Sequence, residues 1–172
     1  LLALTLYQEA LEAFEDAIDI YPRYVEPWIG KGRALLRLRR PQEALEAFQK
    51  ATETDPDNAD AWRRKGRALL ELKRYQEALE AFEKTIELNP ADTVAWGNKG
   101  LVCLRLTRQQ DALEAFEKVI ELDQMSETAW LGKGVALLEL KRREEAALSF
   151  KRADELHKKS LLASQEKGDA AL

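Results

Sequence analysis

The chain has 172 residues, of which 45% are hydrophobic, and its formal net charge at pH 7 is −4. This length and composition allow a substantial hydrophobic core, and the acidic total argues against nucleic-acid binding over the whole surface. The single cysteine cannot form an internal disulfide, and no apolar run reaches membrane-spanning length, so we expect a cytoplasmic protein.

Apolar residues recur at helical spacing along the whole chain, which predicts amphipathic helices joined by short turns. The first predicted helix covers residues 8–20, and helix pairs follow it. Proline ends a helix that it follows and is tolerated in the first turn of the next one. Helix ends are therefore predicted before Pro22, Pro56 and Pro90, and helix starts near Pro27 and Pro41. The predicted pairs are 26–39 with 42–54, 60–73 with 76–88, 94–106 with 110–122, and 128–140 with 144–158.

A 34-residue period runs through these helices. Each tryptophan is followed by glycine after 4 residues, alanine after 16 and phenylalanine after 20. A fixed period of this length is typical of a stacked repeat array, in which each unit packs mainly on its neighbours. We expect the tryptophans to act as core anchors. The sets are Trp28, Gly32, Ala44 and Phe48; Trp62, Gly66, Ala78 and Phe82; Trp96, Gly100, Ala112 and Phe116; and Trp130, Gly134, Ala146 and Phe150.

This pattern resembles the tetratricopeptide repeat (TPR), in which Trp-x-x-x-Gly, alanine, phenylalanine and proline recur in the same period. The resemblance implies an all-α fold, a right-handed superhelical α-solenoid of antiparallel helix pairs, and covers residues 1–172 as a single array. A partial repeat is expected at 1–24 and a C-terminal helix extension or cap at 161–172. The full repeats are 25–58, 59–92, 93–126 and 127–160.

Departures from the family pattern lead to local predictions. Gln124 and Lys158 replace the expected proline, and the last helix is therefore expected to continue through Leu162. Thr107 and Gln110 are predicted to form a capping box that opens the helix after them. The glycine often found between the two helices of a repeat is replaced by Arg39, Lys73, Thr107 and Lys141.

The chain begins Leu1-Leu2-Ala3-Leu4, without methionine or a basic lead-in, so it lacks the pattern of a signal peptide. In phase with the repeat, these residues match the end of a first helix whose beginning is missing. We therefore expect a fragment, or a chain whose earlier residues are disordered. Leu4, Leu11 and Phe14 would then expose an apolar face for docking on a second copy, because array ends need polar caps.

Charge is distributed unevenly between the helices. Residues 26–40 hold five basic residues against Glu26, whereas residues 8–20 hold five acidic residues and no basic one. In the family, first helices line the concave surface, so the resemblance implies a groove that changes from arginine-rich to aliphatic along its length. The groove residues expected from it are Arg33, Arg37, Arg63, Arg64, Arg67, Asn98, Leu101, Arg105, Leu131 and Val135.

No group of residues indicates catalysis, a metal site or a cofactor. His157 is the only histidine and lies far along the chain from Cys103, the only cysteine, so neither a metal-ligand set nor a histidine-activated nucleophile is predicted. Cys103 is expected to be a small buried apolar residue. We therefore expect a chain that is not an enzyme.

The leading hypothesis is a non-catalytic protein–protein interaction scaffold. Because arginine binds carboxylates with two parallel hydrogen bonds, the expected ligand is a peptide or protein segment with acidic and hydrophobic residues in the groove. One alternative is nucleic-acid binding by the basic inner helices, although the predicted groove lacks aromatic residues for base stacking. Another alternative is self-association into a homo-oligomer through the exposed repeat ends. No membrane partner is expected.

Overall fold

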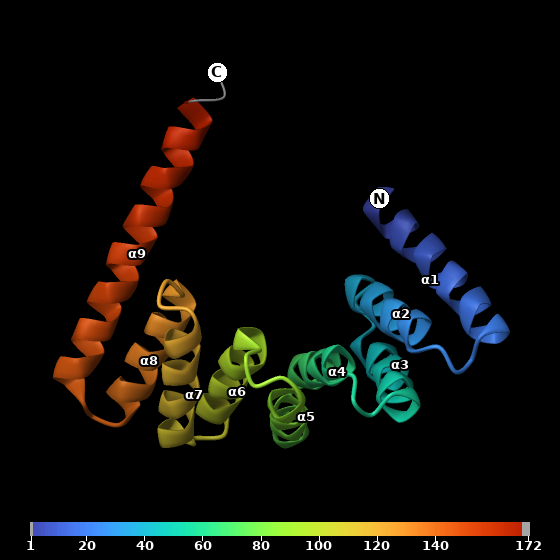
Figure 1. The fold of residues 1–172 in the computed structure, drawn as a ribbon, viewed down its shortest axis with the longest axis horizontal. Coiled ribbons are helices and arrows are strands. Elements are labelled where there is room, and N and C mark those ends of the chain that lie inside the picture. The colour runs from blue at the N-terminus through green and yellow to red at the C-terminus, as the bar shows by residue number, and fades with distance from the viewer. Residues whose placement is uncertain (1, 170–172) are drawn as a thin grey trace. The chain divides into compact units, whose positions relative to one another are not determined.

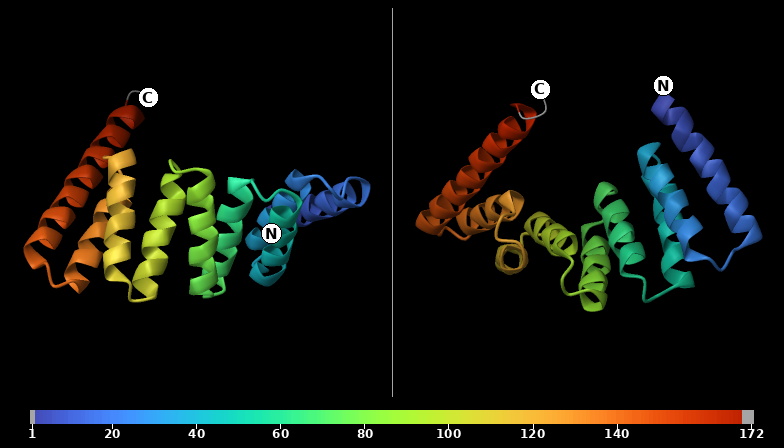
Figure 2. Two further views of the ribbon diagram at one scale, coloured as in Figure 1. Left: turned by 60° about the horizontal axis from the view of Figure 1, so that its bottom comes forward. Right: turned by 45° about the horizontal axis from the view of Figure 1, so that its top comes forward.

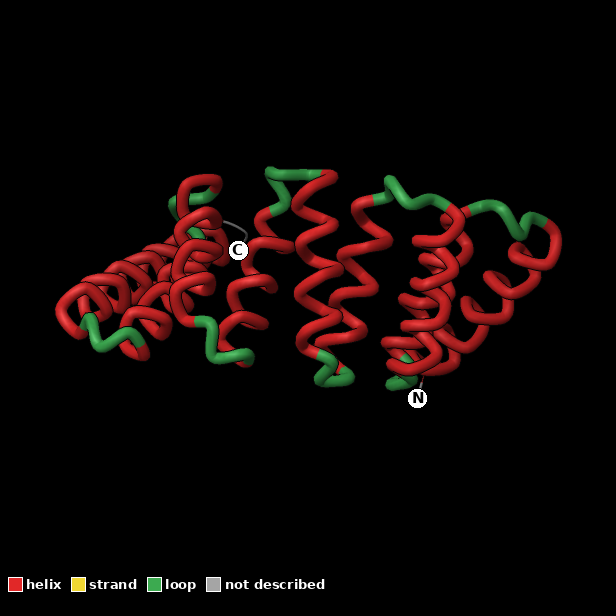
Figure 3. The backbone as a smooth tube through the Cα atoms, turned by 90° about the horizontal axis from the view of Figure 1, so that it is seen from below, coloured by secondary structure: helices red, strands yellow, loops and turns green. Residues whose placement is uncertain are grey.

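A computed structural model describes the backbone of residues 2–169 and the side chains of residues 4–163. Within residues 2–169 the chain forms nine helices and no strand, joined by short loops (Figures 1 and 3). The prediction of an all-helical fold is confirmed. The helices are α1 (Leu2–Ile20), α2 (Val25–Arg37), α3 (Pro41–Thr54), α4 (Ala59–Glu71), α5 (Tyr75–Leu88), α6 (Thr93–Arg105), α7 (Gln109–Leu122), α8 (Glu127–Glu139) and α9 (Arg143–Asp169).

Contacts between residues divide the chain into two compact units. Unit 1 runs to Ala95 and contains α1 to α5 with the start of α6, whereas unit 2 begins at Trp96 and contains the rest of α6 with α7 to α9. Within unit 1, each helix from α1 to α4 packs on the next one, and α2 also touches α4. Within unit 2, α8 packs on both α7 and α9. In addition, Gly100 of α6 lies against Phe116 of α7, so each predicted helix contacts a neighbour in the chain, as expected for stacked repeats.

A phenylalanine from each second helix of a repeat packs on a glycine of a first helix. Phe82 of α5 is fully buried, and a Cβ atom added at Gly66 of α4 would lie 2.8 Å from its ring. Phe116 of α7 has the same relation to Gly100, where the added atom would also lie 2.8 Å away. Only hydrogen fits at such distances, because protein interiors are close-packed. The recurrence of glycine and phenylalanine in the sequence therefore reflects the close approach of two helices.

The tryptophans are half-buried, and Trp28, Trp62 and Trp130 each tie a first helix to the loop before it. The indole N–H of Trp62 donates to the carbonyl of Pro56 at 2.8 Å, and the ammonium of Lys65 lies 4.6 Å from the centre of the ring. Burial lowers the pKa of Lys65. The predicted core role is thus refined, because the ring packs while its polar edge fixes a loop. The same N–H contact joins Trp28 to Pro22 at 3.2 Å and Trp130 to Gln124 at 3.2 Å.

The turn inside each repeat passes through one residue with a left-handed backbone. At the first turn, the N–H of Arg39 bonds to the carbonyl of Leu36 at 3.1 Å and that of Arg40 to Leu35 at 2.9 Å, the pattern of a Schellman helix end. Glycine tolerates this conformation without strain, whereas a residue with a side chain loses about 1 kcal/mol. The values of φ are 61° at Arg39, 59° at Lys73, 57° at Thr107 and 63° at Lys141.

The predicted capping box of Thr107 and Gln110 is wrong. The N-cap residue of α7 is Arg108, and no side chain caps it. The Thr107 hydroxyl donates to the carbonyl of Leu106 at 2.7 Å, and Gln110 donates to Glu114 at 3.4 Å. The prediction fails because the turn requires a left-handed backbone at Thr107, whereas an N-cap residue is normally extended.

The helices at the two ends of the chain are longer than the repeat requires. No proline or glycine interrupts α1 between Leu2 and Ile20, so residues 2–4 do not end a separate first helix, and that prediction is wrong; Leu1 lies outside the described residues. The predicted continuation of the last helix past Lys158 is confirmed, since α9 runs to Asp169 (Figure 2). The extension predicted for 161–172 is described as far as that residue.

The apolar face expected at the start of the array is mostly covered. Leu11 is only 3% exposed, and the ring of Phe14 packs directly on Gly30 of α2. The prediction that both residues are open for docking is therefore wrong, because α2 covers them. Leu4 and Leu6, at 52% and 57% exposed, are the apolar residues of this part of α1 that face solvent.

Candidate functional site

A hollow of about 680 Å³ lies in unit 1 between α1, α2 and α4. Its charged lining comes from α2, from the turn after α2 and from α4, and it holds five arginines and one glutamate. We call it the arginine hollow. The charged residues that define it are Arg33, Arg37, Arg39, Arg64, Arg67 and Glu71.

The floor of the arginine hollow is apolar and comes mainly from α1. Tyr7, Ala10 and Phe14 lie one helical turn apart on α1 and line it together with Ala34 of α2. Because Gly30 has no side chain, Phe14 can lie flat against α2 without filling the hollow. The hollow is therefore lined both by apolar side chains, mainly from α1, and by positively charged side chains.

Arg33, Arg37 and Arg39 have no carboxylate partner among the described residues. The guanidinium of Arg37 instead lies over the ring of Tyr7, 5.9 Å from its centre. Arg67 has a side chain that is 70% exposed, and within the described part of the chain its acidic contact is with Glu71 at 3.8 Å. Such a long, exposed pair contributes little. Most of the positive charge of the arginine hollow is therefore not neutralised by the protein.

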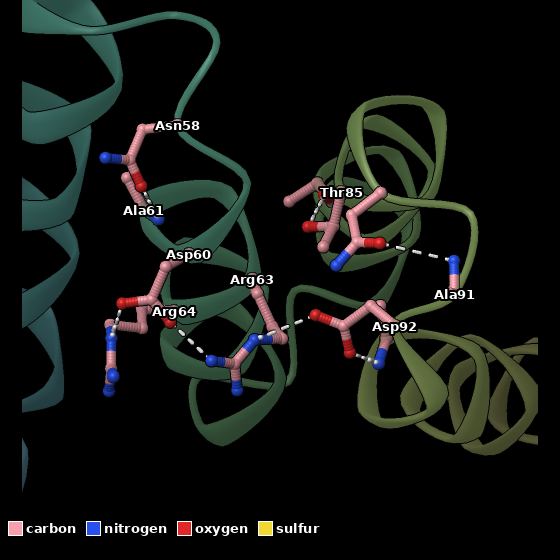
Figure 4. Close-up of polar contacts among 11 residues, drawn as sticks. Asn58, Asp60, Ala61, Arg63, Arg64, Thr85, Ala91 and Asp92 are labelled. Atoms are coloured by element: carbon pink, nitrogen blue, oxygen red, sulfur yellow. Dashed lines mark hydrogen bonds and ion pairs between the residues drawn. The ribbon is translucent and has the colours of Figure 1, made fainter.

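Arg64 and Arg63 are bound more firmly by carboxylates of the protein. Arg64 lines the arginine hollow and pairs with Asp60 of the same helix at 2.6 Å. Arg63 does not line it: its guanidinium pairs with Asp60 and, through Nε at 3.2 Å, with Asp92 (Figure 4). Asp92 also accepts the N–H of Ala95 at 2.8 Å and so caps α6. Arg63 thus links α4 to the beginning of α6.

The structure brings together four of the predicted groove residues, namely Arg33, Arg37, Arg64 and Arg67, in the arginine hollow. Sequence reasoning missed Arg39 and Tyr7. The sequence predicts a turn at Arg39 but does not indicate that its side chain lines the hollow. The signal for Tyr7 was its spacing of three and seven residues from Ala10 and Phe14 on one helical face.

The predicted groove residues of unit 2 form a different surface. Leu101 of α6 and Leu131 and Val135 of α8 are 48%, 41% and 38% exposed. Asn98 is half-buried, and Arg105 is exposed without an ionic partner among the described residues. Val135 occupies the repeat position that Arg33 and Arg67 hold in unit 1. The corresponding surface of unit 2 is therefore mainly aliphatic.

The remaining candidates from the sequence have structural roles. Cys103 is fully buried, as predicted. His157 of α9 contacts Glu127 of α8 through Nδ1 at 3.1 Å and helps to join the two helices. Across the side chains that the structure describes, no cluster of histidine, cysteine, aspartate and glutamate could hold a metal ion. None of the described helices combines the length and apolarity needed to cross a membrane.

Comparison with known structures finds the same architecture in MamA. A crystal structure of MamA is 27% identical in sequence, with a TM-score of 0.87 over 90% of this chain and 91% of that one. MamA from Desulfovibrio magneticus RS-1, residues 41 to the end, is also 27% identical, with a TM-score of 0.84 over 89% and 86% of the chains. MamA AMB-1 is 21% identical with a TM-score of 0.82, over 90% and 91% of the chains, and supports the fold alone. No curated protein sequence matches the chain.

A family model described as the tetratricopeptide repeat matches residues 1–52, 29–93, 77–124 and 98–160. These matches overlap and together span nearly all of the predicted array. They agree with the 34-residue period, with the phenylalanine and glycine contacts, and with the neighbour-on-neighbour packing of the helices. The chain therefore belongs to the tetratricopeptide repeat family and has the architecture of a protein–protein interaction scaffold.

Proposed function

We propose that the arginine hollow of unit 1 binds a segment of a partner protein that carries acidic residues next to hydrophobic ones, and that the protein acts without catalysis. The observation that carries this proposal is that Arg33, Arg37 and Arg39, which line one hollow, have no carboxylate partner among the residues whose side chains the structure describes. Guanidinium groups bind carboxylates through charge-assisted, often paired hydrogen bonds. The apolar floor formed by Tyr7, Ala10 and Phe14 suits the hydrophobic residues of the same segment.

In unit 2, the exposed side chains of Leu101, Leu131 and Val135 are proposed to contact apolar residues of a protein partner. Hydrophobic contacts of this kind add affinity without charge selectivity. A cytoplasmic location, expected from the single cysteine, stays a prediction.

The test uses a fluorescein-labelled peptide of alternating aspartate pairs and leucine, with a matched peptide in which asparagine replaces aspartate. Fluorescence anisotropy measures the Kd of both for the wild type and for Arg33→Glu/Arg37→Glu. A control variant, Arg143→Glu/Lys151→Glu, changes the net charge equally at two exposed positions of α9. Circular dichroism checks that all three proteins are folded.

We expect the wild type to prefer the aspartate peptide, and Arg33→Glu/Arg37→Glu to weaken its binding by about tenfold or more, the loss of at least one charged hydrogen bond. The control variant should bind within about twofold of the wild type, because neither of its two changed residues lines the arginine hollow. Equal binding by both double variants would refute the proposal. Tighter binding of a labelled oligouridine than of the aspartate peptide would favour the nucleic-acid alternative instead.

A further inference from the structure

Two sets of arginines in this chain differ in their acidic partners. Four arginines precede the second helices, and each binds a carboxylate three residues later. In the second repeat, Arg74 binds Glu77 through Nε at 2.7 Å and Nη2 at 2.6 Å. This hydrogen bond holds the pKa of Glu77 below its usual value. The other members are Arg40 with Glu43, Arg108 with Asp111, and Arg142 with Glu145.

The arginine hollow contains the opposite arrangement. Arg33, Arg37 and Arg39 have no carboxylate within the described part of the chain, and the single glutamate of the lining, Glu71, is 3.8 Å from Arg67. Each arginine that precedes a second helix thus has a carboxylate three residues later. Among the described arginines that line the hollow, only Arg64, through Asp60, and Arg67, through the distant Glu71, have an acidic partner. A ligand must bring the missing negative charge.

The position of Arg37 favours a ligand with more than two acceptor oxygens. Its guanidinium carbon lies 5.9 Å from the centre of the Tyr7 ring, within the range of a cation–π contact. The N–H groups of a guanidinium point outward in its own plane, and stacking on a ring leaves them available. A carboxylate has two oxygens and one charge, which saturate a single guanidinium fork. The three unpaired guanidinium groups of the hollow can therefore donate more hydrogen bonds than one carboxylate can accept.

We propose that the arginine hollow receives a phosphorylated side chain of the bound protein segment. This inference rests on the proposed function and names the group that the segment presents. A phosphomonoester carries about −1.5 to −2 charges at pH 7 and three strong acceptor oxygens, so it pairs with two or three guanidinium groups at once. The hollow, at about 680 Å³, is larger than one phosphorylated side chain and has room for the residues beside it.

The first experiment compares three labelled peptides that differ only at one central residue, which is serine, glutamate or phosphoserine. Each has the same flanking aspartate and leucine residues, and anisotropy measures the Kd at fixed ionic strength. The expected order of affinity is phosphoserine, then glutamate, then serine, with about a tenfold gap between the first two, since phosphate doubles the charge and adds an acceptor. Equal affinity for phosphoserine and glutamate, both above serine, would overturn the phosphate assignment and leave acidic-segment binding intact. No preference for either charged peptide would overturn both proposals.

The second experiment keeps the charge of the hollow and removes its guanidinium forks. In Arg33→Lys/Arg37→Lys, the phosphoserine preference should shrink by about fivefold or more while glutamate binding stays within about twofold, because lysine acts as a point charge. The matched control is Arg40→Lys/Arg74→Lys, which changes two arginines that already hold carboxylates. An equal loss of preference in both double variants would overturn the proposal.

Competition with inorganic phosphate separates a protein segment from a free anion. Inorganic phosphate should displace the labelled phosphopeptide only at concentrations at least about a hundredfold higher than the unlabelled phosphopeptide, because it lacks the flanking contacts. Displacement at equal concentrations would show that the hollow takes the free anion, and would overturn the assignment to a phosphorylated segment.

Discussion

The first helices α4 in unit 1 and α8 in unit 2 share one framework and differ at the surface. Asn58 and Ser126 cap them in the same way, each accepting the N–H of the residue three positions later. Both helices end in a Schellman turn, at Lys73 and Lys141. Their exposed positions diverge, since Arg67 of α4 corresponds to Val135 of α8. The two helices therefore share their capping and turn positions, whereas a solvent-exposed position differs in charge and polarity.

The largest expected effect tests whether the packing of phenylalanine on glycine contributes equally to stability in both units. Phe82→Ala in unit 1 and Phe116→Ala in unit 2 should each lower the free energy of unfolding by about 3–5 kcal/mol, because each ring is buried against a glycine. Urea denaturation followed by circular dichroism measures both. Tyr21→Ala, at a 63% exposed residue, is the control and should change stability by less than about 0.5 kcal/mol. If only one of the two variants lost little unfolding free energy, the two units would differ in how much this packing stabilises them.

Two glycines should respond in opposite directions. At Gly30 of unit 1 an added Cβ atom would overlap the ring of Phe14, so Gly30→Ala should destabilise by about 1–3 kcal/mol. At Gly97 of unit 2 an added Cβ atom meets nothing within 4 Å, so Gly97→Ala should stabilise by about 0.5–1 kcal/mol through helix propensity. Urea midpoints compare the two. Stabilisation at Gly30 would show that the close approach to Phe14 is not required.

The loop before α2 lacks the side-chain N-cap that the loops before the other first helices provide. Tyr24 is the N-cap residue of α2 and makes no side-chain cap, whereas Asn58 accepts the N–H of Ala61 at 3.0 Å. Tyr24→Asn should therefore raise the free energy of unfolding by about 1 kcal/mol. Tyr24→Phe provides the control, since it adds no cap and should leave stability unchanged. A thermal melt that rises equally for both would rule out capping as the cause.

Exchanging a surface residue should alter binding more than stability. Arg67→Leu and Val135→Arg each place in one unit the side chain that the other unit carries. Both residues are exposed, so each change should shift the free energy of unfolding by less than about 0.5 kcal/mol. Arg67→Leu should nevertheless weaken binding of the aspartate peptide. A large loss of unfolding free energy in Arg67→Leu would mean that Arg67 stabilises the fold and is not only a surface residue.

The smallest expected effect is a shared dependence on pH. The hydrogen bonds from Arg74 and Arg142 hold the pKa values of Glu77 and Glu145 below the usual 4.5. A carboxyl with a lowered pKa contributes stability above its unfolded pKa and loses it as the pH falls through the folded pKa. Stability should therefore decline below about pH 4.5 through these pairs in both units. Urea midpoints at pH 7 and pH 3 should differ less for Glu77→Gln, and an unchanged difference would contradict this origin.

The sequence predicts the repeat framework to within one or two residues at most helix boundaries, because each packing residue recurs four times at the same spacing. It fails where one unit departs from the others. The sequence near Thr107 fits a capping box, yet the turn of the repeat demands a left-handed residue there. The residues before Leu6 fit a separate helix in phase, yet nothing in residues 2–20 interrupts α1.

The candidate site is less predictable because side-chain pairing is decided in three dimensions. Arg63 and Arg67 lie on one helix and have the same charge, but Asp92, at the end of the same repeat, binds Arg63 and not Arg67. Arg39 lies in a turn, where helical spacing does not indicate that its side chain lines the hollow. Spacing indicates which helix faces a groove, whereas the contact of Arg63 with Asp92 spans 29 residues of sequence and does not follow from helical spacing.

Because of the indole contacts, tryptophan fluorescence can report the detachment of a loop from the helix that follows it. Trp28 and Trp62 in unit 1 and Trp130 in unit 2 each hold their N–H on the carbonyl of the preceding loop. When a loop detaches, its indole meets water and its emission moves to longer wavelength. A chain that keeps one tryptophan and replaces the others by phenylalanine will therefore report on a single repeat. Comparing the emission of Trp28 alone with that of Trp130 alone will reveal whether the two units melt together or one after the other.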